Sequence, residues 1–233
     1  MVWICPRESR RSSKTLPLCF YSPAVLPPSG SICMRVELLS HTPDPERLCC
    51  AAAKLTHEPE DRDFMEMYSS LSQEHIERVL KYVLEKHHES VVEHASFTFY
   101  VEGISRVLTH QLVRHRIASY SQQSQRYVTL KDFSYVTPPT LDEKGIEVFK
   151  TSMKNIAEEY ERLMESVHAE DARYVLPNAC TTKIIITMNA RELRHFFSLR
   201  LHKTAQWEIK DMAQRMHELC TSVAPLLFRD IKI

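Results

Sequence analysis

Hydrophobic side chains recur with helical and strand periods along most of the chain. The apolar positions of residues 72–88 follow the i, i+3, i+4, i+7 spacing of an amphipathic helix, for which Ser72 is a suitable N-terminal cap. Residues 95–101 alternate between polar and apolar side chains, as a half-buried strand does. Residues 107–112 predict a further helix that runs directly into Arg114.

The rest of the pattern mixes helices with strands. The remaining predicted elements are a first strand over residues 34–39, a long helix over 146–167, a short helical turn that reaches Arg173 and stops at Pro177, a strand over 181–188, and final helices over 190–201 and 206–228. Because helices and strands do not alternate as regular βαβ units, the pattern favours an α+β fold over a doubly wound parallel sheet.

Residues 1–33 differ from the rest of the chain. They contain five prolines and a basic patch but no clear amphipathic period, which predicts a disordered extension. Pro17 and Pro23 interrupt the apolar run that a signal peptide would need. We therefore expect one folded domain over residues 34–233 and consider Met34 a candidate start of translation. Peptides from before Met34 in the native protein would contradict that start.

Composition narrows the possible functions. The chain of 233 residues carries 30 basic and 30 acidic side chains, so no overall charge draws it to nucleic acid or to a membrane. Its three glycines are too far apart for a glycine-rich nucleotide-binding loop. Its seven cysteines include no Cys-x-x-Cys pair, a usage typical of the reducing cytoplasm.

The densest cluster of candidate functional side chains is residues 114–126, with the sequence Arg-His-Arg-Ile-Ala-Ser-Tyr-Ser-Gln-Gln-Ser-Gln-Arg. Arginine presents a fork of donors that is always charged, and it converges here with serine hydroxyls. The predicted elements place the cluster at a helix end and in the loop beyond it, where backbone groups lack internal partners. The sequence thus predicts a phosphate or carboxylate site.

The order of these residues resembles the signature of the flavin-dependent thymidylate synthases: Arg-His-Arg, then seven residues, then Ser, with Arg two places later. The resemblance runs from Met34 to the C-terminus and includes residues 88–94, 173–177, 189–191, 199–200 and 205–208. It implies a helix-flanked antiparallel sheet in a homotetramer whose active sites are shared between subunits.

The resemblance also implies a reaction. It is the reductive methylation of dUMP to dTMP, with 5,10-methylenetetrahydrofolate as carbon donor, FAD as the source of hydride and NADPH as reductant. The classical folate-only synthases instead activate the uracil ring with a cysteine in a Pro-Cys-His setting. No cysteine here has those neighbours, and Cys180 lies between Ala179 and Thr181. The flavin type is therefore favoured.

Arg200 matches the catalytic arginine of the family, which stabilises negative charge around N3 of the uracil and its neighbouring carbonyl group. The alternative is that Arg200 caps a helix C-terminus. Ser124 matches a hydroxyl at the nucleotide phosphate, and no base beside it is evident that would make it a nucleophile. The substrate-binding positions implied by the resemblance are Gln111, Arg114, Gln122, Gln123, Ser124, Gln125, Arg126, Arg173 and Arg200.

The flavin-binding positions implied by the resemblance are Ser90, Arg114, His115, Arg116, Ile117, Gln122, Asn189, Ala190, Arg191 and His195. Three of them depart from common family residues: Gln122 stands where some members have glutamate, Ser90 where threonine is common, and His195 where some have asparagine. A histidine such as His88 or His195 could tune the flavin through a hydrogen bond, and a purely structural role is equally open.

Two other functions remain open at this point. His87, His88 and His94, with Glu89 and Glu93, offer zinc or manganese ligands for a metal-dependent hydrolase. The chain lacks a His-Glu-x-x-His motif, however, and a strand that opens at residues 93–94 would point the two side chains to opposite faces. A nucleic-acid-binding module would use the arginine cluster with its interleaved tyrosines, but the zero net charge weighs against it.

Overall fold

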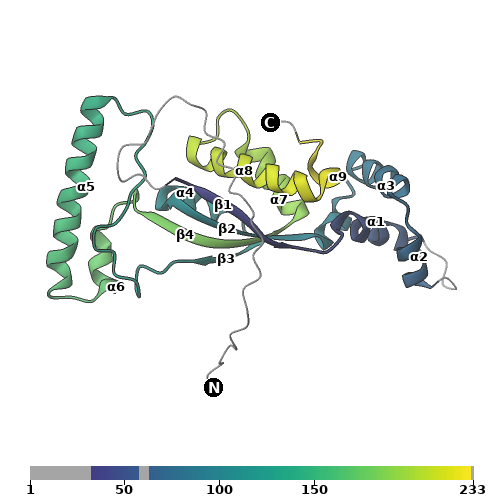
Figure 1. The fold of residues 1–233 in the computed structure, drawn as a ribbon, viewed down its shortest axis with the longest axis horizontal. Helices are drawn as coiled ribbons and strands as arrows, with labels where there is room; N and C mark the ends of the chain where they lie inside the picture. The colour runs from purple at the N-terminus through teal and green to yellow at the C-terminus, as the bar shows by residue number, and fades with distance from the viewer. Residues whose placement is uncertain (1–32, 58–62, 232–233) are drawn as a thin grey trace, which may run out of the picture.

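The computed structural model describes residues 33–57 and 63–231, so the extension predicted for residues 1–33 lies outside the described residues except for Cys33. A single antiparallel sheet with the strand order β1-β2-β4-β3 runs through the molecule (Figure 1). Its strands are β1 (Arg35–His41), β2 (Ser96–Ser105), β3 (Ala118–Gln122) and β4 (Thr181–Asn189). The expected α+β class with a helix-flanked antiparallel sheet is confirmed.

Nine α-helices and two 3-10 helices complete the described part of the chain. They are α1 (Pro45–Leu55), α2 (Phe64–Ser70), α3 (Gln73–Glu85), η1 (Glu89–His94), α4 (Arg106–Leu112), α5 (Glu143–Met164), α6 (Ala169–Ala172), η2 (Arg173–Val175), α7 (Ala190–Arg200), α8 (Trp207–Val223) and α9 (Pro225–Phe228). In the described segments, none of these helices combines the length and the apolar character that a membrane span requires.

The helices form a layer on one face of the sheet and two groups at its ends. Helices α7, α8 and α9 cover one face, α1 to α3 group beyond one end, and α5 stands beyond the other (Figure 1). The main core lies between the sheet and the covering helices, and includes Phe97, Phe99, Ile186, Phe196 and Phe197. Burial of these side chains supplies the largest favourable contribution to folding.

Helix α5 packs against a smaller core of its own, formed around Phe133, Met153 and Cys180. Only Met153 and Tyr160 of its 22 residues are buried. Much of the helix therefore faces away from the rest of the chain.

Local sequence accounts for most of the helix boundaries. The predicted cap Ser72 accepts a hydrogen bond of 3.2 Å from the backbone N–H of His75 and starts α3. Ser105, Asp142 and Asn189 cap α4, α5 and α7 in the same way. In β2, Gly103 takes a φ of 72° where the pairing with β4 shifts register, a conformation that favours glycine.

Four features differ from the sequence-based expectations. Residues 118–122 of the arginine cluster form β3 rather than a loop, because they pair with residues 184–188 of β4. The final helix is divided at Pro225, which cannot donate a helical backbone hydrogen bond. Residues 93–94 lie in the 3-10 helix η1 and do not open a strand. Helices α1 and α2 were not predicted.

Candidate active site

The arginine cluster begins in the turn between the end of α4 and the start of β3. The hydroxyl of Tyr120 lies 2.8 Å from the carbonyl oxygens of both Leu112 and His115, and it shares its one proton between them across the turn. His115 is 4% exposed, whereas its neighbours Arg114 and Arg116 are exposed. The turn thus buries the imidazole and presents a guanidinium group on each side of it.

The buried His115 ring joins two side chains of α7. Its Nδ1 atom lies 3.2 Å from Oε1 of Glu192, and its Nε2 atom accepts a hydrogen bond of 3.1 Å from Nε of Arg200. Glu192 is 6% exposed. Phe196 packs edge-on against the imidazole, with ring centroids 4.9 Å apart. Residues from two distant parts of the sequence therefore form one hydrogen-bonded chain, in which Glu192 and His115 are buried and Arg200 is half-buried.

The hydrogen bond from Arg200 determines where His115 carries its proton. A guanidinium Nε–H only donates, so Nε2 of the ring must be the acceptor and the proton lies on Nδ1, facing Glu192. Burial, together with the positive charges of Arg200 and His195, lowers the pKa of His115 to about 4. Burial also raises the pKa of Glu192. The distance between His115 and Glu192 would suit an ion pair, but the ring is neutral near pH 7 and the contact is a hydrogen bond.

The first turn of α7 carries further residues implied by the resemblance. The side-chain oxygen of Asn189 caps the helix by accepting a hydrogen bond of 2.9 Å from the backbone N–H of Glu192. Arg191 is exposed and pairs with Glu89 and Glu93 of η1, the helix that also carries Ser90. Ser90, Asn189 and Arg191 are thereby brought to one region, and Ala190 lies buried beneath it. The exposed His195 reaches His115 from the next turn, with ring centroids 5.9 Å apart.

A second group lies at the other end of β3. The Gln122 side chain donates to Thr109 of α4 and Thr182 of β4, at 3.3 and 3.2 Å. The backbone N–H of Gln123 donates a hydrogen bond of 2.9 Å to the backbone carbonyl oxygen of Lys183. These bonds fix the strand end from which Ser124 and Arg126 continue.

Glu170 of α6 joins the two arginines of this second group. Its carboxylate forms an ion pair with Arg126 at 2.8 Å, and its backbone carbonyl accepts a hydrogen bond of 2.9 Å from Nε of Arg173. The Ser124 hydroxyl accepts a hydrogen bond of 3.1 Å from the backbone N–H of Arg126. Among the described residues, no carboxylate or imidazole contacts that hydroxyl. This supports a binding role for Ser124 rather than a nucleophilic one.

The predicted residues thus fall into two groups, one around His115 and Arg200 and one around Arg126 and Arg173. Within residues 33–57 and 63–231, no hydrogen bond or ion pair joins the two groups directly; β3 connects them. The half-buried side chains of Gln111 and Gln125 make no hydrogen bond to the rest of the described chain, and Ile117 is 66% exposed.

Sequence reasoning missed Glu192 and Glu170. Glu192 lies one turn before Phe196 on the face of α7 that packs into the core. A carboxylate at an otherwise apolar position of an amphipathic helix is unusual unless it is paired, and that signal could have identified it. Glu170 lies in a short exposed helix and offered no comparable signal.

The described residues do not support a metal centre. They contain no group of three or more histidine, cysteine, aspartate or glutamate side chains arranged to hold a metal ion. His94 and Glu93 lie on η1, where Glu93 pairs with Arg191. The metal-dependent hydrolase considered from the sequence therefore has no support.

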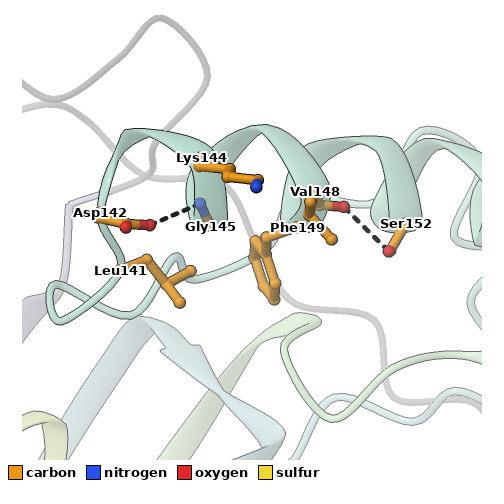
Figure 2. Close-up of a pocket in the computed structure, with 7 residues that line it drawn as sticks. All are labelled: Leu141, Asp142, Lys144, Gly145, Val148, Phe149 and Ser152. Atoms are coloured by element: carbon orange, nitrogen blue, oxygen red, sulfur yellow. Dashed lines mark hydrogen bonds between the residues drawn. The ribbon is translucent and has the colours of Figure 1, made fainter.

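Two further candidates lack suitable chemistry. Cys180 is fully buried, and burial raises the pKa of its thiol to about 12, so it is not poised as a nucleophile. A pocket beside the first turns of α5 is lined mainly by Leu141, Val148 and Phe149 (Figure 2). Its carboxylate, Asp142, is already used to cap the helix through Gly145.

Comparisons with known proteins identify the family of the chain. Residues 37–226 match the family described as "Thymidylate synthase complementing protein". The flavin-dependent thymidylate synthase of Geobacter sulfurreducens is 52% identical over 202 residues, which cover 84% of this chain and 86% of that protein. Those of Clostridium tetani and Pyrococcus furiosus are 45% and 46% identical, over 84% and 79% of this chain and 86% and 78% of their own. The chain belongs to the family of the flavin-dependent thymidylate synthases.

Proposed function

We propose that this protein is a flavin-dependent thymidylate synthase that converts dUMP to dTMP. The overall change is dUMP, 5,10-methylenetetrahydrofolate, NADPH and a proton to dTMP, tetrahydrofolate and NADP⁺. One structural observation carries the proposal. The Arg200 guanidinium donates a hydrogen bond to the buried neutral imidazole of His115, whose neighbours in the chain, Arg114 and Arg116, expose their guanidinium groups. A fixed cation next to an anion-binding surface suits a negatively charged nucleotide whose base gains charge during the reaction.

Arg200 is the catalytic residue in this proposal. Its Nε atom is engaged by His115, and among the described residues no acceptor contacts its two terminal nitrogens. Burial and the nearby Arg114 lower the pKa of Arg200, which still remains charged near neutral pH. The terminal nitrogens are thus available to the uracil around N3 and its neighbouring carbonyl group, where they stabilise negative charge.

The second group of residues holds the nucleotide phosphate. Ser124, Gln125 and Arg126 bind it directly, and Gln111, Arg114, Gln122, Gln123 and Arg173 complete the pocket. The ion pair of Arg126 with Glu170 is about half exposed on both sides, so it is weak and exchangeable. A phosphate dianion competes well for such an arginine.

The residues around His115 fit a flavin dinucleotide. Within the described ranges the side chains of Arg114 and Arg116 have no hydrogen-bond or ion-pair partner, and two unpaired guanidinium groups suit a diphosphate. Ser90, Ile117, Gln122, Asn189, Ala190, Arg191 and His195 would hold the remainder of FAD. When bound, the flavin supplies the hydride, for which NADPH is the ultimate source. Both ring nitrogens of His115 are engaged within the protein, so its imidazole is not free to donate to the flavin.

The homotetramer with shared active sites belongs to the same proposal. Several apolar side chains near the site are exposed in the isolated chain, among them Ile117 at 66%, Tyr174 at 83%, Ile185 at 41% and Leu199 at 47%. Contact with further copies of the chain would cover them. Light scattering of the purified protein tests the tetramer. The cytoplasmic location stays a prediction from cysteine usage.

The reaction is tested by anaerobic conversion of dUMP to dTMP with FAD, NADPH and 5,10-methylenetetrahydrofolate. Omission of FAD from protein stripped of flavin is the control. We expect dTMP only when flavin is present. Folded, flavin-loaded protein that makes no dTMP would contradict the proposal.

A further inference from the structure

The proposed reaction gives no chemical step to the buried Glu192–His115 pair, and the resemblance assigns no role to Glu192. Glu192 is 6% and His115 4% exposed, so neither can reach a substrate in solution directly. Burying two polar groups is costly unless each has a hydrogen-bond partner. Here Glu192 is hydrogen-bonded to His115, and His115 is hydrogen-bonded to Arg200. The arrangement calls for a role that acts through Arg200.

We infer that Glu192 and His115 are positioning residues that hold the Arg200 guanidinium in its working orientation. Glu192 accepts the Nδ1 proton of His115, which leaves Nε2 as an acceptor for Nε–H of Arg200. The inference rests on the proposed function only for what Arg200 does with its terminal nitrogens. The hydrogen-bonded chain itself is independent of the reaction.

The physical need for such a chain follows from the place of Arg200. It is the last residue of α7 and is only half-buried, so its long side chain would otherwise sample many rotamers. A hydrogen bond at Nε fixes the plane of the guanidinium and leaves both terminal nitrogens directed away from the bond. An arginine that is already oriented loses little freedom when charge develops on the substrate.

The imidazole is suited to this task because its own position is fixed. Phe196 packs against it edge-on, and Tyr120 holds the backbone carbonyl of His115. The titratable and charged groups that face the ring are Glu192, His195 and Arg200, with Arg114 near Arg200. Arg200 is cationic and His195 can become so, and both disfavour a second proton on the ring. The tautomer therefore persists over the pH range in which enzymes usually work.

The tautomer is tested by ¹⁵N NMR of the flavin-loaded protein labelled at histidine, with the His115 signals assigned by their loss in His115→Gln. We expect a protonated Nδ1 and an unprotonated Nε2 from pH 8 down to about pH 5, since the pKa of His115 lies at about 4. A proton on Nε2, or a titration midpoint above pH 6, overturns the inference. This measurement does not depend on any activity.

The effect on Arg200 is tested by kinetics of Glu192→Leu, which removes the acceptor, and of His115→Leu. For each we expect kcat to fall on the order of 10- to 100-fold, because the arginine loses its orientation in the transition state. The KM for dUMP should change by less than about threefold, because the phosphate contacts lie elsewhere. Glu46→Gln alters a half-buried glutamate away from the site, which accepts from the backbone N–H of Leu226 on helix α9, and should leave kcat unchanged.

Two variants separate positioning from a merely structural role. His115→Gln keeps a donor group and an acceptor that are bonded to one carbon, as the two ring nitrogens of histidine are, and we expect it to recover most of the kcat that His115→Leu loses. Combining Glu192→Leu with Arg200→Lys should cost little more than Arg200→Lys alone, since the residues act as a unit. Additive losses, or a folded Glu192→Leu protein with kcat within about twofold of wild type, overturn the inference.

A failure of the proposed function would look different. Wild-type protein would then form no dTMP, while the NMR experiment would still report the His115 tautomer. If Glu192→Leu fails to fold, as judged by circular dichroism, the wild-type tautomer and the His115→Gln kinetics decide.

Discussion

The hydroxyl oxygen of Tyr120 lies 2.8 Å from the carbonyl oxygen of His115, five positions earlier in the chain. The same hydroxyl lies 2.8 Å from the carbonyl of Leu112, the last residue of α4. One hydroxyl of β3 thus lies between two backbone acceptors, of which the Leu112 carbonyl also accepts a hydrogen bond of 3.0 Å from the backbone N–H of His115. The turn that carries the Arg-His-Arg sequence is fixed to the sheet by this contact.

Tyr120→Phe should destabilise the protein without unfolding it. The change removes the hydroxyl that donates to the carbonyl oxygens of Leu112 and His115 and leaves these two groups with one partner fewer. The expected cost is about 1–2 kcal/mol, which lowers Tm by roughly 2–8 °C for a chain of this size. Calorimetry of the variant tests this, with Tyr174→Phe, at a side chain that is 83% exposed, as control. Equal losses of Tm in the two variants would contradict the assignment.

Arg200→Lys should retain the fold and lose most of the turnover. Lysine offers a point charge and cannot both donate to His115 and present a fork of donors to the substrate. We expect kcat to fall on the order of 100-fold or more, with an unchanged circular dichroism spectrum. Arg215→Lys, on an exposed ion pair of α8, is the matched control. Near-normal turnover in Arg200→Lys would falsify the catalytic role and leave the helix-capping alternative.

Arg126→Gln should act mainly on substrate binding. Loss of charge-assisted hydrogen bonds to the phosphate costs about 1.5–3 kcal/mol, which raises the KM for dUMP on the order of 10- to 100-fold. The value of kcat at saturating dUMP should change much less. Steady-state kinetics test this, with the exposed Arg78→Gln on α3 as control. A fall in kcat with an unchanged KM would place Arg126 at the reacting centre instead.

The buried thiols should resist modification in the folded protein. Cys49, Cys50, Cys180 and Cys220 are 0% exposed. Burial raises the pKa of Cys49 and Cys180 to about 12. A disulfide reagent should therefore react rapidly with at most three of the seven cysteines, and with the other four only after denaturation. Rapid reaction of four or more thiols in the native protein would show that this burial is wrong.

The same thiols predict a loss of stability in alkali. A thiol whose pKa is raised on folding contributes stability that is fully present below its unfolded pKa, near pH 9, and is lost as the pH rises toward about 12. Cys180→Ser should flatten this part of the curve of unfolding free energy against pH. Guanidinium titrations between pH 8 and pH 11 measure it, and an identical slope in wild type and variant would contradict the contribution of Cys180.

Local pattern was sufficient for elements whose hydrogen bonds close within a few residues. The helix capped by Ser72 and the strand that buries Phe97, Phe99 and Val101 appear where the periodicity predicts them, because each side chain's environment follows from its neighbours along the chain. The family signature likewise identified the family from sequence alone, and it predicts the region of the candidate site.

Tertiary structure decided what depends on distant partners. Residues 118–122 are polar and become a strand only because β4 supplies the backbone partners, which no local pattern encodes. The neutral state of His115 depends on its burial and on the charges of Arg200 and His195, which lie eighty or more positions away in the chain. Sequence therefore determined the family and the residues proposed for the chemistry. The fold determined the protonation and orientation of these residues, because both depend on burial and on contacts between segments far apart in the chain.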